Sequence, residues 1–139
     1  MMTHLDRRTF LKNSALGSAA LGFTARSWSQ VKGANDDIRV AVVGFRSRGR
    51  AHISELLQVK GARIVALCDV DQTVLDHEAS SLKAKGHPVK TYTDVRKLLE
   101  SSEIDAVSTA TPNHWHSLIT VWACQAGKDV YVEKPVSHN

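Results

Sequence analysis

The fold of this chain is decided by residues 38–49, which run Ile-Arg-Val-Ala-Val-Val-Gly-Phe-Arg-Ser-Arg-Gly. The first half of this stretch, 38–43, is β-branched and mostly apolar, which favours a strand buried on both faces of a parallel sheet. The run stops at Gly44, and a second glycine follows at Gly49. Apolar residues between 48 and 59 then recur at helical spacing, and Lys60-Gly61 ends the pattern. We therefore predict a strand, a glycine-containing turn and a helix.

The remainder of the chain repeats this alternation of strand and helix. A buried apolar run ending in Cys68 predicts a second strand, and Thr93 or Asp94 is expected to cap the third helix. Right-handed crossovers between such units produce a doubly wound parallel α/β sheet of the Rossmann type. The further strands are predicted at 64–68, 89–92, 104–110 and 129–132, and the further helices at 72–85, 94–99 and 115–125.

Composition excludes several classes of protein. The chain has 139 residues, 42% of them hydrophobic and 23% charged, which suits one globular domain and not a disordered or coiled-coil chain. No stretch approaches the ~20 apolar residues of a membrane-spanning helix. The formal net charge is +4, but residues 1–30 hold four basic residues and one acidic residue, so most of the excess lies there. Charge therefore gives no support for nucleic-acid binding.

The basic N-terminus predicts an export signal over residues 1–30. Arg7-Arg8-Thr9-Phe10-Leu11-Lys12 precedes a weakly apolar stretch at 14–23, and small residues at Ser27 and Ser29 are typical of a cleavage site. This pattern resembles a twin-arginine (Tat) leader, which implies export in the folded state through the Tat machinery to the periplasm or beyond. The alternative is a basic amphipathic N-terminus of a cytoplasmic protein. Residues 31–37 are polar and are expected to form a linker to a domain at 38–139.

Ligands bind doubly wound sheets at the carboxyl ends of the strands. The first such end carries Gly44 to Gly49, which departs from the dinucleotide pattern G-x-G-x-x-G because Arg46 replaces the second glycine. Arg46, Arg48 and Arg50 crowd the positive end of a helix, which is unfavourable unless an anion binds there. A solvated basic loop is the alternative.

Asp69 follows the second strand, 25 positions after Gly44. The acid that binds the adenosine ribose of a dinucleotide is expected ~20 positions after the glycine turn. A carboxylate there accepts ribose hydroxyls and repels a 2′-phosphate, so Asp69 favours NAD over NADP, whereas Arg46 would favour NADP. Asp69 as an ordinary strand-end residue or helix cap is the alternative.

Two further strand ends carry polar motifs. Residues 111–116, Thr-Pro-Asn-His-Trp-His, are expected to line a cleft, and a metal site is disfavoured because no third ligand stands near the two histidines. Glu133-Lys134-Pro135 follows the fifth strand. A lysine at a buried strand end is costly unless it is used, and burial lowers its pKa toward the range of a general acid–base. A surface Glu–Lys pair is the alternative. Cys68 and Cys124 are expected to be buried thiols, with a disulfide left open.

Together, the glycine turn, the 111–116 run and Glu133-Lys134-Pro135 resemble the nucleotide-binding half of the Gfo/Idh/MocA oxidoreductases, over about residues 36–139. The resemblance implies that NAD, or less readily NADP, binds here. It implies that Lys134 is the catalytic residue, assisting proton transfer from a substrate hydroxyl, and that Glu133 and Lys134 contact the nicotinamide ribose. It also implies a pyrophosphate site formed by Gly44, Phe45, Arg46 and Gly49, a ribose site at Asp69, and a nicotinamide-side wall formed by Thr111, Pro112, Asn113 and His116.

The resemblance also predicts what the chain would need from elsewhere. Members of the family have a second α/β domain that carries most of the substrate pocket, so we expect this chain to be an incomplete N-terminal portion without catalysis of its own. The whole enzyme would oxidise a CH–OH group of a sugar or polyol. Alternatives are a fragment of a glycosidase that uses NAD for transient oxidation, or a non-catalytic nucleotide-binding remnant.

Overall fold

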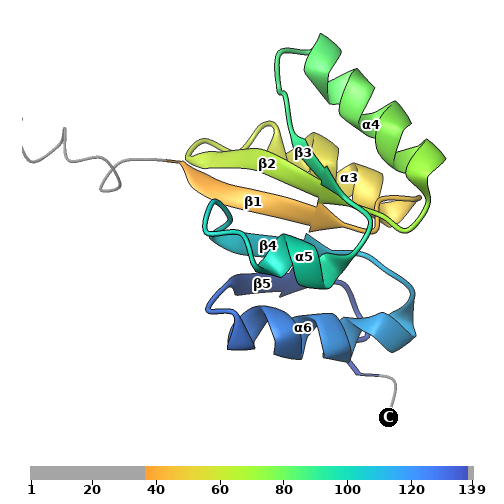
Figure 1. Cartoon of the computed structure of the whole chain (residues 1–139), viewed down its shortest axis with the longest axis vertical. Helices are drawn as coiled ribbons and strands as arrows, with labels where there is room; N and C mark the ends of the chain where they lie inside the picture. The colour runs from red at the N-terminus through yellow and green to blue at the C-terminus, as the bar shows by residue number, and fades with distance from the viewer. Residues whose placement is uncertain (1–36, 138–139) are drawn as a thin grey trace, which may run out of the picture. The chain divides into compact units, whose positions relative to one another are not determined.

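The computed structural model describes residues 37–137, so the expected leader at 1–30 and nearly all of the expected linker lie outside the described residues. Strands and helices alternate along the chain as predicted (Figure 1). The strands are β1 (Ile38–Val43), β2 (Ala62–Cys68), β3 (Lys90–Tyr92), β4 (Ala106–Thr109) and β5 (Asp129–Val132). The helices are α3 (Arg48–Leu56), α4 (Gln72–Ala84), α5 (Val95–Leu99) and α6 (His116–Gln125), with a 3₁₀ turn, η1, at Asn113–Trp115.

The strands form one parallel sheet in the order β3-β2-β1-β4-β5. This order confirms the predicted doubly wound topology, because the chain moves outward from β1 in one direction and then in the other. The strands also end in register: Val43 pairs with Cys68 and with Thr109, and Thr109 pairs with Val132. The residues that follow β1, β2, β4 and β5 therefore lie along the same edge of the sheet.

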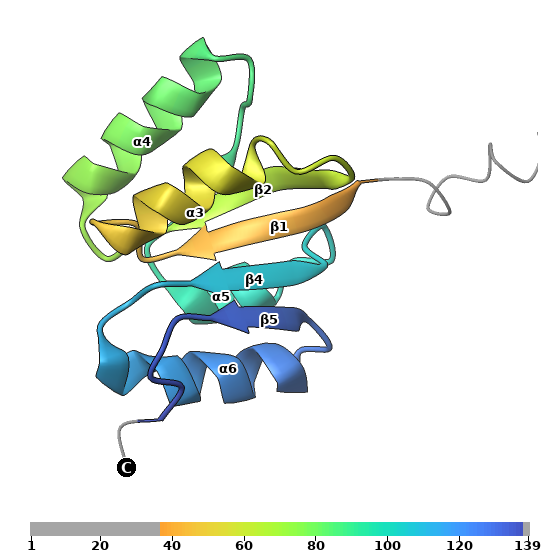
Figure 2. The ribbon, with the colours of Figure 1, turned by 180° about the vertical axis from the view of Figure 1, so that it is seen from behind.

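Helices cover both faces of the sheet, each over its own apolar cluster. One face carries α3 and α4 (Figure 2). On that face Phe45, Leu67 and Leu75 are buried together. On the face of α5 and α6, Leu98, Val107 and Ile119 are buried together. Because alternate strand residues point to opposite faces, Val42 joins the first cluster while Ala41 and Val43 join the second.

The element boundaries differ from the predictions in places where the chain turns. The predicted helix 48–59 ends at Leu56, because the backbone then forms tight turns before Gly61, whose φ is 81°. β2 begins earlier than predicted, at Ala62, and β4 is shorter than predicted. Cys68 is buried, and the burial of the unpaired Cys124 was wrongly predicted, because it lies on the exposed side of α6.

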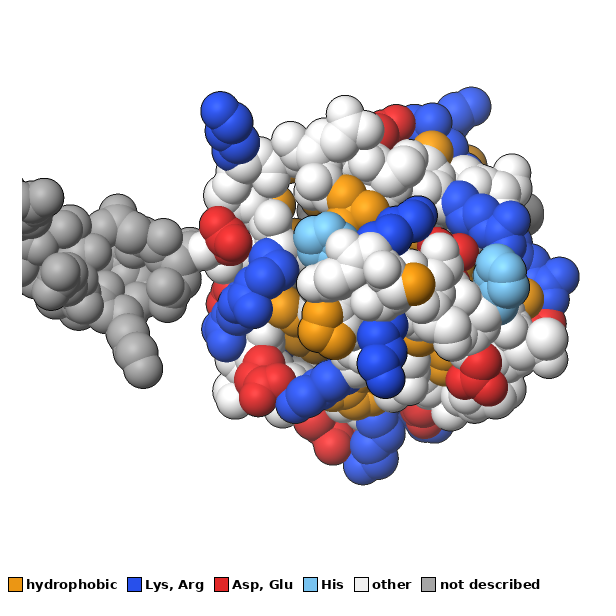
Figure 3. All heavy atoms as spheres, turned by 90° about the horizontal axis from the view of Figure 1, so that it is seen from above, with side chains coloured by type: hydrophobic (Ala, Val, Ile, Leu, Met, Phe, Trp, Pro, Cys, Tyr) orange, Lys and Arg blue, Asp and Glu red, His pale blue; other side chains and the backbone are white. Residues whose placement is uncertain are grey.

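Two surface properties bear on partners. Within residues 37–137 every helix is too short or too polar to cross a membrane. On the face shown in Figure 3, basic side chains are interspersed with acidic ones.

Candidate functional site

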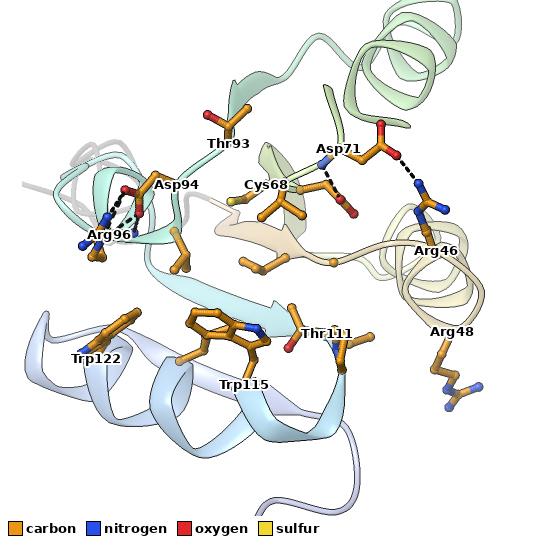
Figure 4. A pocket seen from close by; sticks show the side chains of 18 of the residues that line it. Arg46, Arg48, Cys68, Asp71, Thr93, Asp94, Arg96, Thr111, Trp115 and Trp122 are labelled. Carbon is orange, nitrogen blue, oxygen red and sulfur yellow. Dashed lines mark hydrogen bonds and ion pairs between the residues drawn. The ribbon is translucent and has the colours of Figure 1, made fainter. Parts of the chain in front are cut away.

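A cleft of about 970 Å³ opens at the carboxyl edge of the sheet (Figure 4). It lies where the loop after β1 and the loop after β4 diverge, which is the switch point of the strand order and the usual ligand position in such sheets. Gly44 and Thr111 face one another there. The lining includes Arg46, Arg48, Asp69, Asp71, Asp94, Arg96, Thr111, Pro112, Trp115, Ile119 and Trp122.

The turn after β1 requires both of its glycines. Gly44 has φ 71°, and a Cβ built on it would lie 2.7 Å from Thr111 Cγ2. A Cβ on Gly49 would lie 2.1 Å from the carbonyl oxygen of Gly44. Ser47 has φ 50° and is the one non-glycine residue with positive φ in the described part of the chain. This close backbone packing is what the fingerprint glycines of a dinucleotide site supply.

The helix that follows has an open N-terminus. No side chain caps α3, whereas Asp71 caps α4 by accepting from Thr73 N and Val74 N, and Asp94 caps α5 by accepting from Arg96 N. No side chain therefore competes with an anion at the start of α3, although Gly49 N and Arg50 N already donate to Arg46 O and Ser47 O at 3.3 and 3.1 Å.

The sequence places three arginines at the positive end of α3, which is unfavourable unless an anion binds there. In the structure each of these arginines lies beside a carboxylate of the chain. Arg46 pairs with Asp71, Arg48 Nε donates to Glu133 Oε1 at 2.7 Å, and Arg50 lies 3.6 Å from Glu78. Figure 4 shows Arg46 and Arg48 pointing in different directions. Local carboxylates therefore balance this basic cluster without an added anion.

Asp69 is placed where a ribose-binding acid is expected, at the end of β2 and in the cleft. Its carboxylate accepts hydrogen bonds from Asp71 N at 3.0 Å and Phe45 N at 3.4 Å, which tie the loop after β2 to the glycine turn. Two oxygens offer about four acceptor positions, so the carboxylate retains capacity for hydroxyl groups. The helix cap is the neighbouring Asp71, not Asp69.

The predicted 111–116 segment divides into two parts. Thr111 and Pro112 line the cleft together with Trp115, while Asn113 is exposed in η1 and does not line it. Trp115 and Trp122 form an aromatic wall, with ring centroids 6.5 Å apart (Figure 4).

His116 is buried below this wall. Its Nε2 lies 2.7 Å from Thr111 O, and its Nδ1 lies 2.7 Å from Pro135 O. The ring thus ties the loop after β4 to the loop after β5 and does not line the cleft. Any effect of His116 on a ligand would act through these two loops.

The predicted Glu133-Lys134-Pro135 motif is anchored by its first residue. Glu133 N donates to Thr109 O at 3.0 Å, and the Glu133 carboxylate accepts from Arg48 and from His52 Nε2. Hydrogen bonds from Arg48 and then His52 lower the pKa of Glu133 to about 2, so this carboxylate is ionised near neutral pH. Lys134 is exposed, so the premise that this lysine is buried is wrong.

Sequence reasoning missed several polar residues of this edge. His52 and Ser108 are buried and bonded to one another, and Asp71 holds Arg46. His52 lies three positions after Gly49, which places it on the helix face that packs against the sheet. That spacing, together with the two-residue offset of Asp71 from Asp69, is the signal that could have identified them.

The fold and the cleft define a dinucleotide-binding α/β domain. Residues 38–139 match the family model GFO_IDH_MocA, described as an oxidoreductase family with an NAD-binding Rossmann fold. The chain belongs to this family.

Known proteins of two kinds resemble the chain. A protein named glycosyl hydrolase family 109 protein 2 from Shewanella sp. (strain ANA-3) is 30% identical over 158 residues, which cover 98% of this chain and 35% of that protein. Among solved structures, myo-inositol 2-dehydrogenase from Lactobacillus plantarum is 28% identical with a TM-score of 0.69, over 75% of this chain and 30% of that one. Scyllo-inositol dehydrogenase from Lactobacillus casei with bound NAD(H) and scyllo-inositol is 25% identical with a TM-score of 0.69, over 75% of this chain and 30% of that one. The chain spans about a third of the length of these relatives.

Proposed function

We propose that residues 38–139 bind NAD as the cofactor-binding part of an exported oxidoreductase that acts on a CH–OH group of a sugar or polyol. The observation that carries the proposal is the alignment of four strand ends at one edge of the sheet. Gly44, Asp69 and Thr111 line the cleft at this edge, and Glu133-Lys134 follow the neighbouring strand, where Glu133 pairs with the cleft residue Arg48. Export rests on the twin-arginine pattern in the predicted leader at 1–30, with 31–37 as the linker.

The proposed contacts follow the chain along this edge. The turn formed by Gly44, Phe45, Arg46 and Gly49, at the open end of α3, would hold the pyrophosphate, and Asp69 would accept the adenosine ribose hydroxyls. Thr111 and Pro112 would line the cleft toward the nicotinamide, with Asn113 and His116 supporting that wall. Glu133 would accept from the nicotinamide ribose, beside Lys134.

The chemistry divides between cofactor and protein. When bound, NAD supplies the acceptor for the hydride that leaves the substrate carbon. In its neutral amine form Lys134 would take the proton of the substrate hydroxyl as that hydride leaves, and its exposure leaves the side chain open to a substrate. Because the chain spans about a third of its relatives, we expect it to bind the cofactor without catalysing turnover by itself.

We expect NAD to be preferred over NADP. Asp69 and Asp71 both line the cleft. Asp71 already pairs with the guanidinium of Arg46, which could otherwise bind a 2′-phosphate. Two carboxylates in the ribose region oppose a dianionic phosphate.

The test is a thermal-unfolding titration of the 139-residue chain with NAD and with NADP. NAD at 100 times its dissociation constant is expected to stabilise the chain by about 2.7 kcal/mol. In Asp69→Ala the affinity for NAD should fall more than the affinity for NADP, while Asp76→Ala, on the exposed side of α4, should change neither. Absence of a shift with either dinucleotide contradicts the cofactor proposal, and equal losses in Asp69→Ala contradict the ribose role.

The relatives named glycosyl hydrolase family 109 favour a second candidate, a glycosidase that uses NAD for transient oxidation. The two candidates differ in their products. With a polyol as substrate, an oxidoreductase accumulates NADH. A glycosidase that uses transient oxidation cleaves a glycoside with no net reduction of NAD. The same cofactor site serves both.

A further inference from the structure

A chain of hydrogen-bonded side chains runs from the interior of the sheet to the edge of the cleft. Ser108 Oγ on β4 lies 2.9 Å from His52 Nδ1 on α3, and His52 Nε2 lies 2.9 Å from Glu133 Oε1 after β5. Ser108 and His52 are only 4% and 3% exposed. Arg48 donates to the same Glu133 oxygen from the solvent side. We call these four residues the His52 network.

The partners of His52 assign its protons. An ionised carboxylate only accepts hydrogen bonds, so Nε2 carries the proton that is donated to Glu133. In the neutral ring Nδ1 is then an acceptor, and the Ser108 hydroxyl donates to it. Glu133 thereby selects the tautomer, and the Ser108 hydroxyl stabilises it by donating to Nδ1.

The network joins three elements that are distant in sequence. His52 and Ser108 are separated by 56 positions, and His52 and Glu133 by 81. Glu133 is followed directly by Lys134. The hydrogen bond from His52 to Glu133 therefore also holds the backbone at the point where the chain leaves β5. Among the described residues, every buried side-chain nitrogen and oxygen has a hydrogen-bond partner, so removing one member leaves another unpaired.

We propose that His52 is a positioning residue, which together with Ser108 holds Glu133 in place to receive the nicotinamide ribose of a bound dinucleotide. The inference rests on the proposed function, in which Glu133 contacts that ribose. His52 itself touches no ligand, because it is buried and both of its ring nitrogens are bonded within the protein. Its effect is therefore confined to the nicotinamide half of the ligand.

A merely structural role for His52 is the competing explanation. The ring packs edge-on against Tyr131, with centroids 5.4 Å apart, and fills space between α3 and the sheet. If packing were its whole role, replacement would loosen α3 and weaken binding of both halves of a dinucleotide alike, because the glycine turn leads directly into α3.

The experiment compares NAD with ADP, which contains the adenosine and pyrophosphate but lacks the nicotinamide ribose. Binding of each to the 139-residue chain is measured by calorimetry for the original sequence and four variants. His52→Leu fills the space without a donor, and His52→Gln keeps an amide N–H directed toward Glu133. Ser108→Ala removes the donor to Nδ1 with little change in volume. His77→Asn, at an exposed position on α4, is the control.

We expect His52→Leu to weaken NAD binding by about tenfold or more, because a hydrogen bond to a charged group is lost, and to leave ADP binding within about twofold. Ser108→Ala should weaken NAD binding in the same selective way, and His52→Gln should restore most of it.

Equal losses of NAD and ADP in the His52 and Ser108 variants would show a structural role and overturn the proposal, as would unchanged NAD binding in both. If His52→Leu does not fold, Ser108→Ala and His52→Gln decide between these outcomes. If the original chain binds ADP but not NAD, the nicotinamide-ribose role of Glu133 is wrong, and the inference fails with it. Failure to bind either ligand overturns the proposed function itself.

Discussion

Gly49 is the position where a single added methyl group would be most disruptive. Its missing side chain lets α3 start against the backbone of Gly44, where a Cβ would lie 2.1 Å from a carbonyl oxygen. We expect Gly49→Ala to lower the free energy of unfolding by roughly 3 kcal/mol, because backbone must move.

Gly86 is the matched control for that substitution. It has φ 85° but open space around its Cα, so Gly86→Ala should cost only the left-handed conformation, about 1 kcal/mol. Urea denaturation measures both variants. A loss at Gly49 no larger than the loss at Gly86 would contradict the close packing of the turn.

Glu133 gives the chain a defined pH dependence. Hydrogen bonds from Arg48 and His52 lower the pKa of this carboxylate from its ordinary value of 4.5 to about 2. The folded state therefore binds the proton less readily than the unfolded state, and the stabilisation is complete above about pH 4.5 and lost as the pH falls toward 2.

We expect Glu133→Gln to flatten the decline in the free energy of unfolding between these pH values. Asp94 and Asp105 also have pKa values of about 2, each held low chiefly by hydrogen bonds from a neighbouring arginine, so they keep part of the slope in the variant. Denaturation curves at several pH values measure the difference. Identical slopes for the variant and the original chain would exclude this contribution of Glu133.

The residues of the site differ in how well their positions and partners could be predicted from the sequence. Gly44, Gly49 and Asp69 could be located because their roles depend on the end of a strand and on short spacing. The pairing of Arg48 with Glu133 spans 85 positions, and no local pattern indicates it. The exposure of Lys134 was also missed, because β5 lies at the edge of the sheet and its own residues are exposed or half-buried, which the local sequence does not indicate.

Between the elements, His116 is the main link of the loop after β4 to the loop after β5. Its two ring nitrogens lie 2.7 Å from Thr111 O and Pro135 O. We expect His116→Leu to lower the free energy of unfolding by about 1–3 kcal/mol, because the hydrogen bond from the protonated ring nitrogen to one of these carbonyl groups is lost in a buried setting.

His114 provides the comparison, because it is exposed in the same segment. His114→Leu should stay within about 0.5 kcal/mol of the original chain. Thermal unfolding of both variants, followed by circular dichroism, measures the contrast. A similar small effect for both would mean that the two loops are held together by other contacts.

The strands and helices themselves were largely predictable. The β-branched runs before Gly44 and Asp69 form strands because a sheet buried on both faces needs apolar residues at every position. Their ends were less predictable, since hydrogen bonds between strands, not composition, decide where pairing stops. The 3₁₀ turn at Asn113–Trp115 has no periodic signal and was missed.

Across the full sheet, the account depends on convergence of segments that are far apart in the chain. The alternation of strands and helices predicted a parallel sheet, and parallel strands have all their carboxyl ends at one edge. The cleft residues Trp122, Asp94 and Arg96 could not be predicted, because they lie on α6 and at the start of α5, whose packing is decided only in three dimensions.

A crystal structure of the 139-residue chain soaked with NAD tests this convergence most directly. We expect density for the pyrophosphate against the turn at Gly44–Gly49, for the adenosine ribose beside Asp69, and for the nicotinamide ribose within hydrogen-bond distance of Glu133. A dinucleotide bound with its nicotinamide end away from Glu133 and Lys134, or at another edge of the sheet, would contradict it.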